Sequence, residues 1–236
     1  MVVANNGGQN DFLYHNNGDG TFTKITNSVA VSDDVSSWAA AWGDIDNDGF
    51  LDLFVANSGG SGGANFLYHN NTNDNHWLKF RPIGTRSNRA AIGAKVRVHA
   101  TINGQSVWQL REIPGGDGHM GQNSLHVHVG LGNATNADIV RIEGPSGTVQ
   151  ELTNVGSKQF LTVTEPPHLQ AAGLQPDGGF QVLLTGATGL QYDLQTSSDL
   201  AAWTFWQTVT NTSRTISITD SNVPAFSQRF YRAVGR

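Results

Sequence analysis

The stretch Phe12–Asn17, FLYHNN, recurs without change as Phe66–Asn71, 54 residues further along this chain of 236 residues. Before it, Val2–Gly8 (VVANNGG) matches Phe54–Gly60 (FVANSGG) at an offset of 52 residues. The difference of two residues falls in a Gly/Ser connection, where an insertion costs little free energy. A period near 50 residues, with several short strands per unit, is typical of a β-propeller blade.

The second copy is preceded by Trp42–Asp52, and the first copy has no room for such a segment because Met1 intervenes. We therefore expect the chain to begin part-way through a repeat, with one full and one partial blade. Because a propeller needs about four blades or more to close, we expect the natural protein to extend further towards its N-terminus.

An acidic loop, DIDNDGFLD, lies in the second copy at Asp44–Asp52. Carboxylates on alternate residues of a tight turn converge on one point, and oxygen ligands in this number suit Ca²⁺. Without a cation, carboxylates held this close repel one another. The predicted ligands are the side chains of Asp44, Asp46, Asp48 and Asp52 with the carbonyl of Phe50.

The loop has two other interpretations. An EF-hand requires Glu at loop position twelve and a following helix, but that position is Val55 and the strand-like run Leu51–Ala56 follows. The EF-hand is therefore excluded. A solvated acidic turn without metal stays open as the alternative to calcium.

Composition narrows the class of protein. The chain has no cysteine, which excludes a disulfide framework and cysteine-based metal or redox sites. No run of eighteen apolar residues predicts a transmembrane segment. The net charge of −5 divides into −8 for residues 1–74, +3 for residues 75–165 and zero for the rest, which suggests three units.

The middle of the chain is basic, and no acid occurs between Asn75 and Arg111. One interpretation is a polyanion-binding face, but Lys95–Ala100 alternates charged and apolar residues, as a half-buried strand does. Asn103-Gly104 predicts a type I′ hairpin turn and Val107–Arg111 the return strand. We favour solvated strand faces and expect no nucleic acid partner.

Histidines offer a second metal hypothesis. His126 and His128 share one strand face and His119 lies nearby, so a zinc site is conceivable. Because no adjacent Asp, Glu or Cys completes a ligand set, strand histidines in a polar layer are the favoured interpretation.

The sequence from Thr164–Pro167 onwards predicts a separate unit of short strands, in the manner of a small β-sandwich. Trp203 and Trp206 would make a sugar-stacking pair, but residues three apart in a strand face opposite sides. We therefore expect one tryptophan in the core and the other at an edge.

No catalytic motif is present: the chain has no G-x-S-x-G, no H-E-x-x-H and no closed Walker loop. Distant acids such as Glu112 and Asp117 are able to meet in space, and this alternative stays open. We predict no catalytic residue and a protein that is not an enzyme.

The acidic loop, Asn65–Asn71 and the Gly18–Phe22 turn together resemble the FG-GAP/VCBS repeat of integrin-type propellers. The resemblance implies that calcium at Asp44–Asp52 is structural and that partners bind elsewhere. Gly18-Asp19-Gly20 lacks the ligand series and is interpreted as a hairpin turn.

Residues from His76 to about Thr164 resemble the ASPIC/UnbV domain, which commonly follows FG-GAP/VCBS repeats. The matching stretches are Gly84–Arg89, Ile92–Val96, Arg111–Gly118, His128–Gly132, Pro145–Gly147 and Val149-Gln150. Glu143-Gly144 departs from the family, which usually has a tryptophan there. The last unit resembles a fibronectin-III-like module of bacterial exported proteins.

The predicted class is therefore all-β, with a partial propeller repeat over 1–74, an ASPIC/UnbV domain over 75–166 and a small β-sandwich over 167–236. The predicted function is that of a non-catalytic, calcium-stabilised binding or adhesion protein, extracellular or at the cell surface, with a protein or glycan ligand. A signal peptide is expected upstream. The alternative is a carbohydrate-recognition or accessory module of a secreted enzyme.

Overall fold

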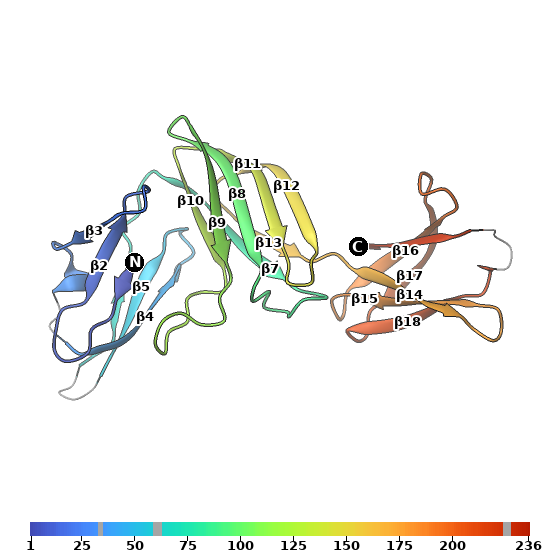
Figure 1. Ribbon diagram of the computed structural model, residues 1–236, viewed down its shortest axis with the longest axis horizontal. Coiled ribbons are helices and arrows are strands. Elements are labelled where there is room, and N and C mark those ends of the chain that lie inside the picture. The colour runs from blue at the N-terminus through green and yellow to red at the C-terminus, as the bar shows by residue number, and fades with distance from the viewer. Residues whose placement is uncertain (33–34, 59–62, 224–227) are drawn as a thin grey trace. The chain divides into compact units, whose positions relative to one another are not determined.

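The computed structural model describes residues 1–32, 35–58, 63–223 and 228–236, which form short strands (Figure 1). Within these residues the only helical element is the single 3-10 turn η1 (Val29–Val31), and no helix is long and apolar enough to cross a membrane. The predicted all-β class is confirmed. Residues 59–62, in the Gly/Ser connection that carries the insertion, lie outside the described residues.

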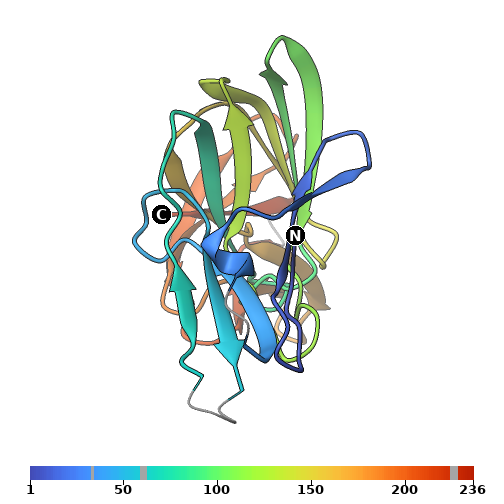
Figure 2. The same cartoon turned by 90° about the vertical axis from the view of Figure 1, so that its left-hand side faces the viewer.

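The duplicated region forms two three-stranded antiparallel sheets with the strand orders β1-β2-β3 and β4-β5-β6 (Figure 2). Their strands are β1 (Val2–Val3), β2 (Phe12–Asn16), β3 (Phe22–Ile25), β4 (Ser37–Gly43), β5 (Asp52–Asn57) and β6 (Phe66–Tyr68). The backbone amide of Ser37 donates to the carbonyl of Asn5 at 2.8 Å and joins the two sheets. The described strands do not close a propeller, as expected for so few blades.

Strand register confirms the duplication. Val2 faces Leu13 and Val3 faces Phe12 in the first sheet, while Phe54 faces Leu67 and Val55 faces Phe66 in the second. These are the same pairs displaced by 52 and 54 residues. Because one residue of slip would turn every side chain to the opposite face, a shared register means a shared core pattern.

The two copies differ at β3. Displaced by 54 residues, Phe22–Ile25 corresponds to His76–Lys79, which is the first half of β7 (His76–Ile83). That strand does not continue the sheet of β6. It lies instead between β10 (Val127–Gly132) and β13 (Gln159–Thr164).

A four-stranded sheet of order β12-β11-β8-β9 follows the same part of the chain. Its strands are β8 (Lys95–Ile102), β9 (Gln105–Glu112), β11 (Asn136–Glu143) and β12 (Val149–Gly156). On β8, Val96 and Val98 are fully buried whereas Lys95 and Arg97 are half-buried, so the predicted alternation is confirmed. Asn103 and Gly104 both have positive φ, 50° and 77°, as a type I′ hairpin between β8 and β9 requires.

The C-terminal strands form two three-stranded sheets, β14-β15-β18 and β17-β16-β19. Val182 and Leu184 from one sheet share a core with Tyr192 and Leu194 from the other, so the predicted small sandwich is present. The strands are β14 (His168–Leu174), β15 (Phe180–Thr185), β16 (Gln191–Ser197), β17 (Thr204–Thr210), β18 (Thr215–Asp220) and β19 (Phe230–Gly235). The sequence pattern predicts all of them except β14.

The two tryptophans of this unit do not form a sugar-stacking platform. Trp206 packs against the core, whereas Trp203 lies just before β17 with the Arg232 guanidinium 4.4 Å from its ring centre. The prediction of one core and one edge tryptophan is confirmed.

Tyr192 gives a test of this core. Its buried hydroxyl accepts a hydrogen bond of 2.7 Å from the Ala187 amide. We expect Tyr192→Phe to lower the free energy of unfolding by about 1–2 kcal/mol, because a buried donor loses its acceptor. Urea denaturation measures the change. Tyr14→Phe in the first sheet is the control, and an equal loss in both variants would contradict the assignment.

The chain divides into two compact units. The first holds residues 1–81, 95–141 and 151–161, and the second holds residues 82–94, 142–150 and 162–236. The division at 74/75 and 166/167 follows family resemblance rather than compactness, and it stays a prediction. The acidic loop lies within the first compact unit.

Candidate metal centre

The loop Asp44–Asp52 turns the chain from β4 into β5, and Gly43 faces Asp52 across the closing pair. Two left-handed residues make the turn tight, Asn47 at φ 61° and Gly49 at φ 92°. A side chain at Gly49 would enter the ring of Trp77, because an added Cβ would lie 1.7 Å from Cε2. The glycine is therefore required by the backbone conformation and by the close approach of Trp77.

The predicted acidic ligands are brought together in two overlapping groups. Oxygens of Asp44, Asp46 and Asp52 lie within 4.8 Å of one another, which is a group able to hold a metal ion. A second group consists of Asp46, Asp48 and the imidazole of His69. All four predicted aspartates thus belong to at least one of the groups, and Asp46 belongs to both.

Backbone amides fix several of these carboxylates. Ile45 donates to Asp52 Oδ2 at 2.9 Å, and Gly49 donates to Asp44 Oδ2 at 3.2 Å. Phe50 lies in the same turn and its amide donates to Asp48 Oδ1 at 2.8 Å. Its carbonyl stays a predicted ligand. Because the amides belong to the loop itself, the carboxylates are oriented before any ion binds.

Asp44 is the most deeply buried of the acids, with its side chain 1% exposed. Its Oδ2 accepts from the ammonium of Lys79 at 2.8 Å. Its Oδ1 is buried without a hydrogen-bond partner in the described part of the chain. A buried, unsatisfied carboxylate oxygen costs free energy, and a bound cation would satisfy it.

His69 joins the site although the sequence did not point to it as a ligand. It follows β6, and its Nε2 lies 2.9 Å from Asp46 Oδ2 and 3.9 Å from Asp48 Oδ2. The hydrogen bond with Asp46 raises the pKa of the imidazole and lowers the pKa of the carboxyl group. The available sequence signal is the second FLYHNN block, which places His69 on the strand adjacent to β5 and hence beside the loop.

Three side chains from the following sheet cover the loop. Trp77 and Lys79 alternate on β7, and His128 on β10 faces Lys79 across the strand pair. His128 Nε2 lies 2.6 Å from the carbonyl of Gly49, and its ring stacks on Trp77 with centres 6.3 Å apart. The opposite face of this strand pair carries Leu78, Phe80, Val127 and Val129, which are buried. The two faces of the sheet therefore serve a hydrophobic core and the acidic loop.

The histidines of the zinc hypothesis serve other contacts. His128 bonds the Gly49 carbonyl, His126 packs edge-on against Phe160, and His119 stacks on Trp38. None of the three belongs to a metal-binding group among the described residues. Burial lowers the pKa of both His126 and His128. The structure therefore gives the zinc hypothesis no support.

Glu112 and Asp117, the acids left open for catalysis, both line an open cavity of about 260 Å³ next to the two strand histidines. Asp117 also closes its own loop, since its Oδ2 accepts from Asn123 at 3.3 Å and its amide bonds Gly121 at 2.9 Å. This loop in turn holds β4, because Asn123 Oδ1 accepts from the Trp42 amide at 2.8 Å. Asp117 therefore has a structural role there.

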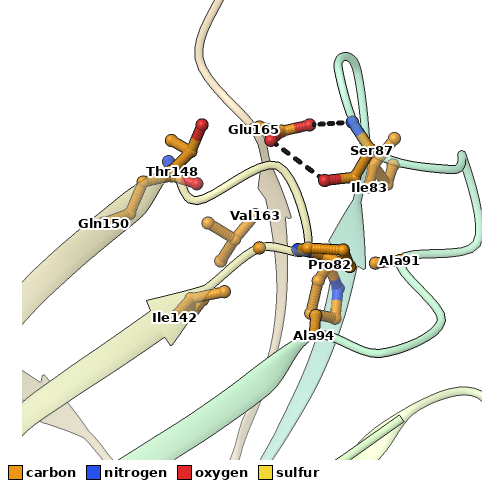
Figure 3. Close-up of a pocket in the computed structure, with 13 residues that line it drawn as sticks. Pro82, Ile83, Ser87, Ala91, Ala94, Ile142, Thr148, Gln150, Val163 and Glu165 are labelled. Carbon is orange, nitrogen blue, oxygen red and sulfur yellow. Dashed lines mark hydrogen bonds between the residues drawn. The ribbon is translucent and has the colours of Figure 1, made fainter. Parts of the chain in front are cut away.

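A second carboxylate cluster lies in the other compact unit, around Glu165 (Figure 3). Successive amides of Thr85, Arg86 and Ser87 donate to Oε2 at 2.8 to 2.9 Å, and the hydroxyls of Ser87 and Ser146 donate to Oε1. Although burial alone would raise it, these hydrogen bonds lower the pKa of Glu165 to about 2. The adjoining cavity is apolar and holds about 20 Å³, room for a single water rather than a ligand.

Comparison with known families agrees with this organisation. Residues 1–55, which include the acidic loop, match the model of the FG-GAP-like repeat, and residues 84–170 match the model described as ASPIC and UnbV. No curated protein matches the chain. FG-GAP repeats commonly bind Ca²⁺ and are typically extracellular, and domains of these two families are typically non-catalytic. The fibronectin-III-like resemblance of the last unit stays a prediction. The chain thus carries an FG-GAP-like repeat followed by an ASPIC/UnbV segment.

Proposed function

We propose that this chain is part of a non-catalytic, calcium-stabilised extracellular binding protein, with Ca²⁺ held by the loop Asp44–Asp52. One observation carries the calcium proposal: the buried Asp44 Oδ1 has no partner among the described residues and belongs to a group of three converging carboxylates. A divalent cation would satisfy that oxygen and neutralise the mutual repulsion of the acids.

The chemistry of the donors selects the ion. The residues that would hold it are Asp44, Asp46, Asp48 and Asp52 with the carbonyl of Phe50, so every predicted donor is an oxygen. Oxygen donors favour Ca²⁺ or Mg²⁺ over the softer metals, and a turn that supplies five of them suits the larger ion. When bound, the ion supplies positive charge that fastens the loop between β4 and β5.

Asp46 gives the sharpest test of the calcium proposal. Its side chain is 49% exposed, so we expect Asp46→Asn to leave the metal-free fold unchanged and to weaken Ca²⁺ binding about tenfold or more. Calorimetric titration of the full chain with CaCl₂, together with melting curves in CaCl₂ and in chelator, measures both effects.

Asp19→Asn is the matched control. Asp19 is an exposed turn aspartate whose Oδ1 accepts from the amide of Thr21, two residues on, in the same way that Asp46 accepts from Asp48. The control should bind Ca²⁺ like the wild type. Absence of heat on titration, together with a melting curve that chelator does not shift, would refute the calcium proposal.

A binding role for the rest of the molecule is proposed from the matched families. The ligand would be a protein or a glycan, and nucleic acid is not expected, because the basic residues of β8 lie on a strand face where His99 already contacts Asp138 at 3.2 Å. Pull-down from extracellular fractions and a glycan array, both run in CaCl₂, test this role. Turnover of an esterase or glycosidase substrate that persists in Asp46→Asn would contradict the non-catalytic proposal.

A further inference from the structure

Lys79 is a buried lysine on a strand face that elsewhere would meet solvent. The residue is 3% exposed, and β7 places it between the core residues Leu78 and Phe80, on the opposite face. A lysine is almost never fully buried unless it is paired. Here the acidic loop covers it, so the loop and the ammonium group bury each other.

The ammonium group is bonded as a ligand-like cation of the loop. Nζ donates to Asp44 Oδ2 at 2.8 Å and to Asn47 Oδ1 at 3.1 Å, and it lies 5.2 Å from the ring centre of Phe160. Asn47 adopts its left-handed φ of 61° in the same turn. The lysine thus contacts two residues of the calcium loop from a strand outside the repeat.

The two oxygens of Asp44 are differently occupied. Oδ2 faces Lys79 and the Gly49 amide, while Oδ1 is buried and without a partner in the described residues. The lysine therefore neutralises one side of a carboxylate whose other side is open to an ion. Two cations that share one carboxylate repel each other, and the repulsion is strong where water is excluded.

We propose that Lys79 is a resident counter-cation of the acidic loop, which keeps the loop folded without calcium and lowers its affinity for calcium. The proposal rests on the proposed function, because it concerns the affinity of that same site. Trp77 and His128 hold the loop against β7 and β10 from either side of Lys79, so the ASPIC/UnbV strands set the metal affinity of the preceding repeat.

Lys79→Gln separates charge from hydrogen bonding, since the amide still donates to Asp44 and Asn47 while the positive charge is gone. We expect calorimetric titration of the full chain to show Ca²⁺ binding about tenfold tighter or more in this variant than in the wild type. The melting temperature in chelator should fall, and saturating CaCl₂ should close the gap to the wild type.

Lys95→Gln is the matched control, because Lys95 lies on the half-buried outer face of β8 and has no contact with the loop. Its calcium affinity and its melting curves should equal those of the wild type. Lys79→Met, which removes charge and donors together, should show the same tightening with a larger loss of stability in chelator. If it folds only in CaCl₂, calcium is replacing the lost cation, as the proposal requires.

Weaker or unchanged affinity in the folded Lys79→Gln variant would overturn the proposal, and so would failure of both variants to fold in saturating CaCl₂. The outcomes also separate the two proposals. Calcium binding by the wild type without tightening in the variants leaves the calcium site standing and removes only the role of Lys79. Absence of binding in every variant removes both.

Discussion

Gly49→Ala should unfold the first compact unit at temperatures where the wild type is intact, with a loss of about 3 kcal/mol or more in the free energy of unfolding. The added methyl group would lie 1.7 Å from Cε2 and 2.0 Å from Cζ2 of Trp77, so one of the two backbones must move. Movement would separate the loop from β7 and break the bond between His128 and the Gly49 carbonyl. Urea denaturation followed by tryptophan fluorescence measures the loss.

Gly20→Ala isolates the steric part of this effect. Gly20 has φ +89°, close to the +92° of Gly49, but a Cβ added at Gly20 would meet nothing within 4 Å. Its substitution should cost about 1 kcal/mol, which is the strain of left-handed backbone alone. Equal losses in the two variants would show that Trp77 does not constrain the loop. Calcium should restore Gly20→Ala fully and Gly49→Ala only in part.

Glu165→Gln should destabilise the second compact unit by about 3 kcal/mol at neutral pH. The wild-type carboxylate accepts from three successive amides and two hydroxyls, and an amide group cannot accept at both of its ends. The NH₂ group of the variant would face donors. Chemical denaturation at pH 7 measures the loss, and Glu112→Gln, at an exposed acid of β9, is the control.

The pH dependence of Glu165 has a definite sign. Its pKa is about 2 in the folded chain against an ordinary value of 4.5, so the folded state binds its proton less tightly than the unfolded state. The stabilisation is therefore complete above about pH 4.5 and is lost as the pH falls towards 2. We expect the wild type to lose stability over that range and Glu165→Gln to lose less. Parallel acid denaturation curves for the two proteins would contradict the assignment.

The repeat and its loop are predictable because both depend on local sequence. FLYHNN and the flanking match determine which residues pair, and the spacing of Asp44, Asp46, Asp48 and Asp52 determines which carboxylates converge. Alternation along Lys95–Ala100 likewise predicts one buried face. Each of these patterns lies within a few residues of the structure that it specifies.

The groups around the loop are not predictable in this way, because they depend on pairing between distant strands. Sequence alone places Lys79 among solvated basic residues and His128 among the strand histidines of a polar layer, whereas the β7–β10 register sets them opposite each other over the loop. Glu165 reads only as part of a boundary, yet it is 7% exposed and bonded to amides 78 to 80 residues earlier. One sequence does not reveal contacts of that separation.

The recruitment of β7 has a consequence for dissecting the molecule. The residues that match β3 of the first copy are His76–Lys79, and in the second copy they complete the sheet of β10 and β13 rather than that of β6. A chain cut after residue 74 would release the repeat without the lysine and the tryptophan that cover its loop. A cut after residue 83 would deprive the next sheet of its central strand. The repeat and its neighbour therefore overlap by one strand, and neither has a boundary at which it can be separated intact.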